Sequence, residues 1–114
     1  MPADSSEVKS VVVVGAGPAG LRAAEVAAAG VARGSVVICE AQPSAGRKFL
    51  VAGRGGLNLT HAEPAENFPA RYRAEPERWR DLLREFGPDD LRDWAANLEV
   101  QTYVGTSHRV FPRG

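Results

Sequence analysis

The stretch Val11-Val12-Val13-Val14-Gly15-Ala16-Gly17-Pro18-Ala19-Gly20 decides the fold of this chain. Four β-branched residues predict a strand, the glycines that follow predict a tight turn, and Pro18 predicts the first turn of a helix. A strand, a glycine turn and a helix in that order form the arrangement by which many α/β proteins hold the pyrophosphate of a dinucleotide.

Each glycine of this turn meets a different steric demand. Gly15 permits the turn that leaves the strand, and Gly17 has no Cβ, so a diphosphate can approach the backbone. Gly20 lets the following helix pack close to the strand. We expect that helix to span residues 18–29, with Gly30 in the left-handed conformation after its last turn.

The start of this helix is itself an anion-binding element. A helix N-terminus carries about half of a positive elementary charge and several N–H groups without helical partners. We therefore expect a diphosphate to be held there without any basic side chain.

A second apolar strand, residues 35–40, ends in Glu40, twenty positions after Gly20. At that place a carboxylate can accept hydrogen bonds from ribose hydroxyls, and it would repel the 2′-phosphate of NADP. The alternative interpretation is a strand–helix–strand unit whose glutamate is simply solvated.

Composition excludes several classes of protein. The 114 residues contain 14 Lys and Arg and 14 Asp and Glu, so net charge gives no reason to expect a nucleic-acid or membrane partner. The single cysteine, Cys39, can form neither an intrachain disulfide nor a metal site, and we expect it to be buried. The polar start and the short apolar run argue against a signal peptide or membrane span, so we expect a cytoplasmic protein.

The rest of the chain changes character twice. Residues 41–74 are rich in Gly and Pro and predict a long irregular segment. Residues 75–98 show apolar spacing typical of two amphipathic helices broken at Gly87-Pro88, and we expect Trp79 and Trp94 to pack in the core. Residues 100–104 and 109–111 predict a β-hairpin.

The irregular segment carries a second ligand-like motif, Gly46-Arg47-Lys48-Phe49-Leu50 followed by Gly53-Arg54-Gly55-Gly56-Leu57-Asn58-Leu59-Thr60-His61. Arg47 and Lys48 can neutralise phosphates, and Asn58 and Thr60 can hydrogen-bond a polar heterocycle. A flexible surface loop rich in Gly and Arg is the alternative.

Three runs of the sequence together resemble a known family: GAGPAGLRAAE, CEAQPSAGRKFLVAGRGGLNLTH and RVFP. They are similar to the N-terminal part of BaiN-type NAD(P)/FAD-dependent oxidoreductases, flavoproteins of the two-dinucleotide-binding-domain superfamily. The resemblance covers residues 10–112, and its most specific part is the run 46–61.

The resemblance implies FAD as the cofactor, with NAD(P)H as a possible electron donor in a longer relative. It places the glycine turn at the pyrophosphate, Glu40 at the adenosine ribose, the basic pair beside the dinucleotide, and the second motif near the ribityl chain or isoalloxazine ring. No side chain need be the catalyst, since the flavin carries the reaction. The expected cofactor-binding residues are Gly15, Gly17, Pro18, Ala19, Gly20, Glu40, Arg47, Lys48, Gly55, Gly56, Asn58 and Thr60.

We expect structural rather than chemical roles for the two histidines. We expect His61 to make a hydrogen bond that orients its loop rather than to transfer a proton. His108 stands before RVFP where a small residue is expected, and we expect its side chain to be exposed.

We therefore expect an α/β fold: a partial Rossmann-like FAD-binding domain with two amphipathic helices and a hairpin. Residues 1–114 would be the N-terminal portion of an FAD/NAD(P)-binding domain, truncated and without a substrate domain, because a doubly wound sheet needs more than two parallel strands. Two alternatives stay open: a nucleotide-binding remnant without turnover, and a truncated NAD-binding dehydrogenase domain.

Overall fold

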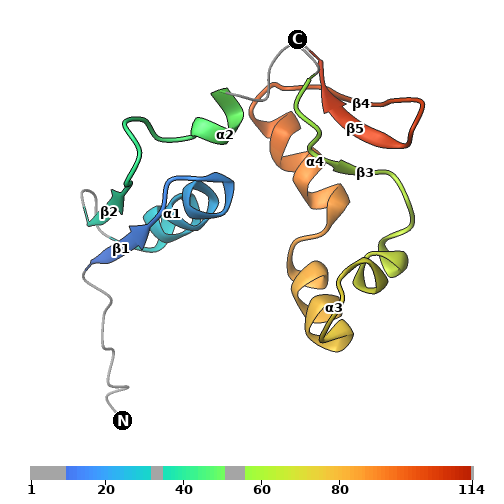
Figure 1. The fold of residues 1–114 in the computed structure, drawn as a ribbon, viewed down its shortest axis with the longest axis horizontal. Helices are drawn as coiled ribbons and strands as arrows, with labels where there is room; N and C mark the ends of the chain where they lie inside the picture. The colour runs from blue at the N-terminus through green and yellow to red at the C-terminus, as the bar shows by residue number, and fades with distance from the viewer. Residues whose placement is uncertain (1–9, 32–34, 51–55, 114) are drawn as a thin grey trace. The chain divides into compact units, whose positions relative to one another are not determined.

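The structure is a computed structural model that describes residues 10–31, 35–50 and 56–113. The chain divides into two compact units, Met1–Gly53 and Arg54–Gly114. Figure 1 shows the elements of each unit, and the two are described separately below.

The first unit contains the predicted strand–helix–strand arrangement. Its elements are β1 (Val11–Val14), α1 (Pro18–Gly30), β2 (Val36–Cys39) and the short α2 (Arg47–Leu50). The two strands are parallel and pair from Val11 with Val36 to Val14 with Cys39. Because parallel strands need a crossover, α1 must pass over one face of the pair.

The end of α1 differs from the prediction. Gly30 is the last helical residue, and the chain leaves the helix through Val31 in an extended conformation, with φ −126° and ψ 165°. The expectation that Gly30 adopts the left-handed conformation is therefore wrong, because this helix ends without a left-handed cap.

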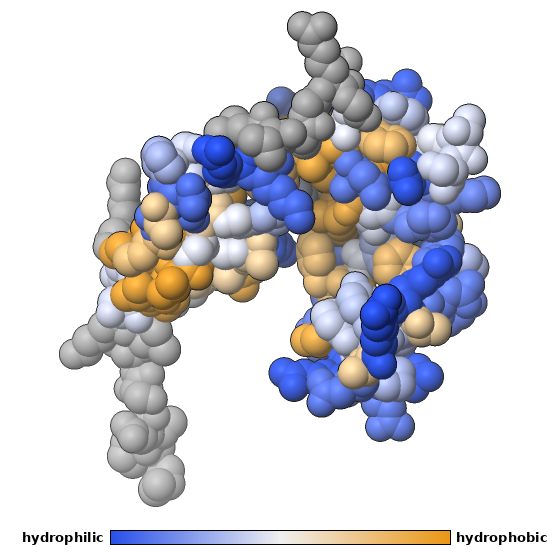
Figure 2. Space-filling view, viewed as in Figure 1, coloured by the Kyte–Doolittle hydropathy of each residue, from blue (hydrophilic) through white to orange (hydrophobic). Residues whose placement is uncertain are grey.

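The strands of this unit expose much apolar surface. Val11 and Val13 are half-buried, whereas Val12 and Val14 on the opposite face are 63% and 86% exposed. Figure 2 shows this apolar surface in orange over the strands of the first unit. Cys39 is also exposed, so the prediction that it is buried is wrong. The β-branched composition indicates a strand that is covered on both faces, and the described residues of this unit cover β2 only partly.

The second unit is built around a small antiparallel sheet. Its strands, β3 (Thr60–His61), β5 (Arg109–Pro112) and β4 (Thr102–Val104), lie in that order. Val110, on the central strand, is fully buried. The other elements of the unit are η2 (Ala65–Asn67), η3 (Pro69–Arg71), α3 (Pro76–Glu85) and α4 (Pro88–Asn97).

The two helices break where the sequence predicts. Gly87 is the N-cap of α4, and its N–H donates to Asp90 Oδ2 at 2.7 Å, which satisfies one backbone group at the break. Trp79 stacks on Tyr72, with ring centroids 3.7 Å apart. Both tryptophans are only half-buried, and Leu82 on the same apolar stripe is 49% exposed. The two tryptophans, which were predicted to pack in the core, are therefore only partly covered.

The hairpin of β4 and β5 confirms another prediction, and it gains a third strand that the sequence did not reveal. Thr60 of β3, which lies inside the segment expected to be irregular, pairs with Val110 of β5. At the hairpin turn, His108 N–H donates to Gly105 O at 3.1 Å. His108 is exposed as expected, and its φ is 61°.

The backbone at His108 gives a physical reason for expecting a small residue there. A residue that carries a Cβ and adopts the left-handed backbone conformation destabilises the fold by about 1 kcal/mol or more relative to glycine. We expect His108→Gly to raise the free energy of unfolding by about 1 kcal/mol, measured by urea denaturation. His108→Ala removes the same ring but keeps the Cβ, so it should not stabilise the chain; equal effects of both variants would contradict the backbone explanation.

Candidate functional site

The first and third glycines of the turn are required by the fold itself. Gly15 has a φ of +103°, a conformation that other residues rarely adopt. A Cβ placed on Gly20 would lie 1.8 Å from the carbonyl oxygen of Gly15 and 3.4 Å from Val13 Cγ1. The first turn of α1 therefore packs directly against the turn and strand, the close approach that the sequence predicts for Gly20.

Gly17 differs from its two neighbours because the fold does not need its small size. Its φ of −79° is ordinary, and a Cβ placed there would find no protein atom within 4 Å. The lack of a side chain leaves open space beside the start of α1.

Backbone donors surround this open space. The first helical bond of α1 runs from Leu21 N–H to Gly17 O at 2.9 Å. Among the described residues, no backbone acceptor pairs with the N–H groups of Gly17, Ala19 and Gly20. The first turn of α1 also has no acidic side chain. A helix N-terminus with these features can receive an anion.

Ala16, between the two glycines, joins three segments of the chain. Its N–H donates to Glu40 Oε2 at 2.5 Å, and its carbonyl accepts the N–H of Gly46 at 2.7 Å. Ala16 is only 2% exposed. Neither this residue nor the role of Gly46, whose φ is +64°, was predicted from the sequence. A glycine immediately before the basic pair was the available signal.

Glu40 follows β2 directly, close to the predicted strand end, and the structure also places its side chain beside the glycine turn. Its second oxygen, Oε1, accepts the N–H of Gln42 at 3.2 Å. The backbone N–H of Ala16, and then that of Gln42, hold the pKa of the Glu40 carboxyl below its usual value. The carboxylate is thus ionised and fixed in place, and each oxygen keeps a lone pair for a further donor.

The basic pair also belongs to this first unit. Arg47 and Lys48 are exposed residues of α2, and the bond from Gly46 N–H to Ala16 O ties the start of α2 to the glycine turn. The first unit therefore brings the glycine turn, the acidic residue and the start of the basic segment into one hydrogen-bonded cluster.

The remaining predicted residues belong to the second motif. Gly55 lies outside the described residues. Gly56 has a φ of +84°, and a Cβ there would lie 3.4 Å from Phe111 Cδ1. Asn58 is exposed, and Thr60 is part of β3. Within the second unit, the glycine-rich motif thus packs on the RVFP motif, although the two are far apart in sequence.

His61 makes the kind of local hydrogen bond expected of it. Its Nδ1 accepts the N–H of Glu63 at 3.1 Å, so the proton of the neutral ring is assigned to Nε2. The carboxylate of Glu63 forms two bonds with Arg71, at 3.0 and 2.7 Å. The Arg71 guanidinium lowers the pKa of Glu63. His61 thus helps to hold the loop that follows β3.

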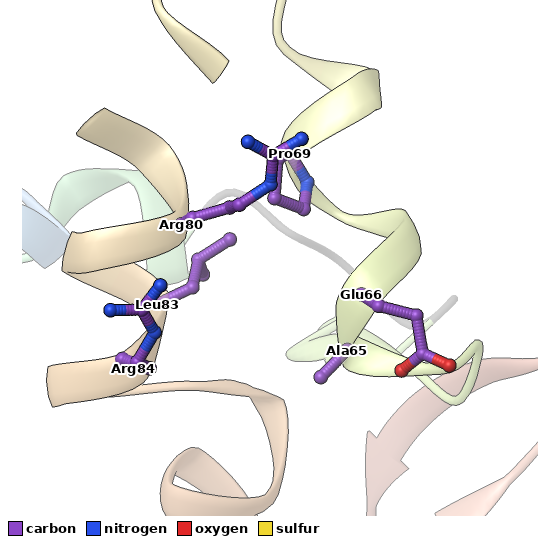
Figure 3. A pocket seen from close by; sticks show the side chains of 6 residues that line it. All are labelled: Ala65, Glu66, Pro69, Arg80, Leu83 and Arg84. Atoms are coloured by element: carbon purple, nitrogen blue, oxygen red, sulfur yellow. The ribbon is translucent and has the colours of Figure 1, made fainter. Parts of the chain in front are cut away.

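A hollow of about 230 Å³ lies between α3 and the 3₁₀ helices η2 and η3. Figure 3 shows Arg80 and Leu83 pointing toward Pro69, while the carboxylate of Glu66 points away. The lining of this hollow contains none of the residues predicted to bind a cofactor. It consists of Ala65, Glu66, Pro69, Arg80, Leu83 and Arg84.

The described residues offer neither a membrane-spanning helix nor a cluster of metal ligands. The longest described helix, α1, has 13 residues, and none of the described helices has the length and apolar character needed to cross a bilayer. The described residues also contain no group of three His, Cys, Asp or Glu side chains placed to hold a metal ion.

Comparison with known proteins agrees with the geometry of the first unit. Residues 9–114 match the family described as HI0933-like protein Rossmann domain. The chain belongs to the HI0933-like family. A segment of 101 residues is also 31% identical to the 3-dehydro-bile acid delta(4,6)-reductase of Clostridium scindens, covering 89% of this chain and 24% of that relative.

Membership in the HI0933-like family confirms the predicted fold class and the resemblance stated from the sequence. The match runs through both units, so the second motif and the hairpin belong to the same family pattern as the glycine turn. The chain spans about a quarter of the length of the curated relative that it matches.

The packing of Gly20 provides a test of this geometry in the HI0933-like chain. We expect Gly20→Ala to lower the free energy of unfolding by on the order of 3 kcal/mol, because its Cβ would overlap the Gly15 carbonyl. Thermal unfolding followed by circular dichroism measures the loss. Unchanged stability would mean that α1 does not approach the turn this closely.

Proposed function

We propose that this HI0933-like chain binds FAD through the cluster in its first unit and that it acts as part of a flavoprotein oxidoreductase. The observation that carries the proposal is the open space at Gly17, bordered by the backbone donors of α1. A pyrophosphate fits this place because it needs hydrogen-bond donors and no side chain in its way.

Each part of the first unit has a defined task in this proposal. The N–H groups of Gly17, Ala19 and Gly20 bind the pyrophosphate, with Gly15 and Pro18 shaping the turn. Glu40 accepts hydrogen bonds from the adenosine ribose through the lone pairs that Ala16 and Gln42 leave free. Arg47 and Lys48 neutralise charge beside the dinucleotide.

The resemblance to BaiN-type flavoproteins assigns a second set of residues to the cofactor. Gly55, Gly56, Asn58 and Thr60 approach the ribityl chain or the isoalloxazine ring. When bound, FAD supplies the chemistry of hydride transfer. The residues of this chain bind and orient the cofactor.

Two considerations favour FAD over other dinucleotides. The charge of Glu40 disfavours the 2′-phosphate of NADP. FAD rather than NAD is supported by the BaiN-type motifs in the second loop, and the curated relative is named as a reductase.

The cofactor itself is the simplest test. We expect the purified protein to be yellow, or to take up added FAD with quenching of flavin fluorescence, and to prefer FAD to NAD in parallel titrations. If the protein is colourless and does not bind added FAD, the result favours the alternative of a nucleotide-binding remnant without turnover. A preference for NAD would overturn the cofactor assignment.

The open space at Gly17 allows a sharper test. We expect Gly17→Val to leave the fold intact, because no protein atom lies within 4 Å of the new Cβ, and to weaken FAD binding by about 100-fold or more. Gly30→Ala, at the far end of α1 and equally free of contacts, is the matched control and should keep full affinity. Unchanged affinity in Gly17→Val would show that the loop is only a turn.

A further inference from the structure

Consecutive N–H groups of the glycine turn donate to consecutive residues at the end of β2. Gly15 N–H donates to Cys39 O at 2.7 Å, and Ala16 N–H donates to the side chain of Glu40. In a regular strand, neighbouring N–H groups point to opposite edges. The positive φ of Gly15 changes this direction, so both donors face the same neighbouring segment.

The donor at Ala16 therefore needs a side-chain acceptor. Ala16 is almost completely buried, and an unpaired N–H there would destabilise the loop. β2 ends at Cys39, and the backbone bends away through residues 41–44. The carboxylate of Glu40 takes the place that a main-chain carbonyl would have in a continuing ladder.

We propose that Glu40 is a positioning residue for the glycine turn: it fixes the turn through Ala16 N–H before any nucleotide is present. This role is separate from the contact with ribose, and its importance for nucleotide affinity rests on the proposed function. A carboxylate suits the position because both of its oxygens accept backbone N–H groups. A glutamine side chain would direct its amide hydrogens at one of those two donors.

The charge state of Glu40 follows from the same geometry. The donors that lower its pKa are backbone groups, with Ala16 first. The ionisable side chains on the described elements of this unit are Arg22 and Glu25 on α1, which pair at 2.9 Å, Cys39 on β2, and Arg47 and Lys48 on α2. The pKa of Glu40 in the folded chain lies below the reference value of 4.5. The stabilisation that the ionised Glu40 gives the folded chain is therefore complete above about pH 4.5 and is lost as the pH falls through the folded pKa of Glu40.

The Ala16 amide reports this bond directly. In the nitrogen-15 spectrum of the full chain without nucleotide, we expect the Ala16 proton shift to titrate with a midpoint below 4.5. The titration should vanish in Glu40→Gln and persist in Glu25→Gln, which removes an acidic charge elsewhere in the same unit. An Ala16 shift that ignores pH, or that titrates in Glu40→Gln, overturns the proposal.

Hydrogen exchange at neutral pH provides a second measurement. We expect Glu40→Gln to speed exchange at Ala16 by about tenfold or more and to leave Ala24, buried in α1, unchanged. Glu40→Asp keeps the charge on a shorter side chain, and it replaces Glu40→Gln in this exchange measurement if the glutamine variant does not fold. Equal acceleration at Ala24 in both variants would contradict a role confined to the turn.

FAD titration separates this proposal from the proposed function. Wild-type protein that fails to bind FAD refutes the cofactor assignment, yet the Ala16 measurements still decide the role of Glu40. If FAD binds, Glu40→Gln should weaken binding by about tenfold or more, whereas Glu25→Gln should not.

Discussion

The first unit depends on one close approach, the contact between α1 and the carbonyl of Gly15 at Gly20. A Cβ at Gly20 would push the helix away from the turn, and its N-terminal donors would no longer border the space at Gly17. The same turn places Ala16 where Glu40 and Gly46 can bond it from two sides. Strand, helix and basic segment are therefore arranged by a backbone geometry that only glycine permits.

The second unit relies on a similar use of glycine. Gly56 lies against the ring of Phe111, and Gly105 would bring a Cβ to 3.0 Å from the same ring. An aromatic side chain between two glycines holds the start of β3 and the hairpin together. The second motif and RVFP, two of the runs that carry the resemblance, are thus in contact within the fold.

The sequence predicted those features that depend on neighbours along the chain. The glycine spacing, the strand after α1 and the break at Gly87-Pro88 are local, and all are present. Features that depend on distant partners were not predicted, or were predicted wrongly. β3 was missed because it forms only where Thr60 pairs with Val110. The exposure of Cys39 was missed because apolar composition does not reveal what covers a strand. The bonds at Ala16 were also hidden, since alanine carries no functional group.

The three glycines of the turn differ in what a side chain would disturb. A side chain at Gly15 or Gly20 would disturb the fold itself, whether or not the chain binds a ligand. Position 17 has no such constraint, because the folded polypeptide tolerates a larger residue there. A larger residue at position 17 would therefore fill only the space beside the start of α1, and this chain has glycine there.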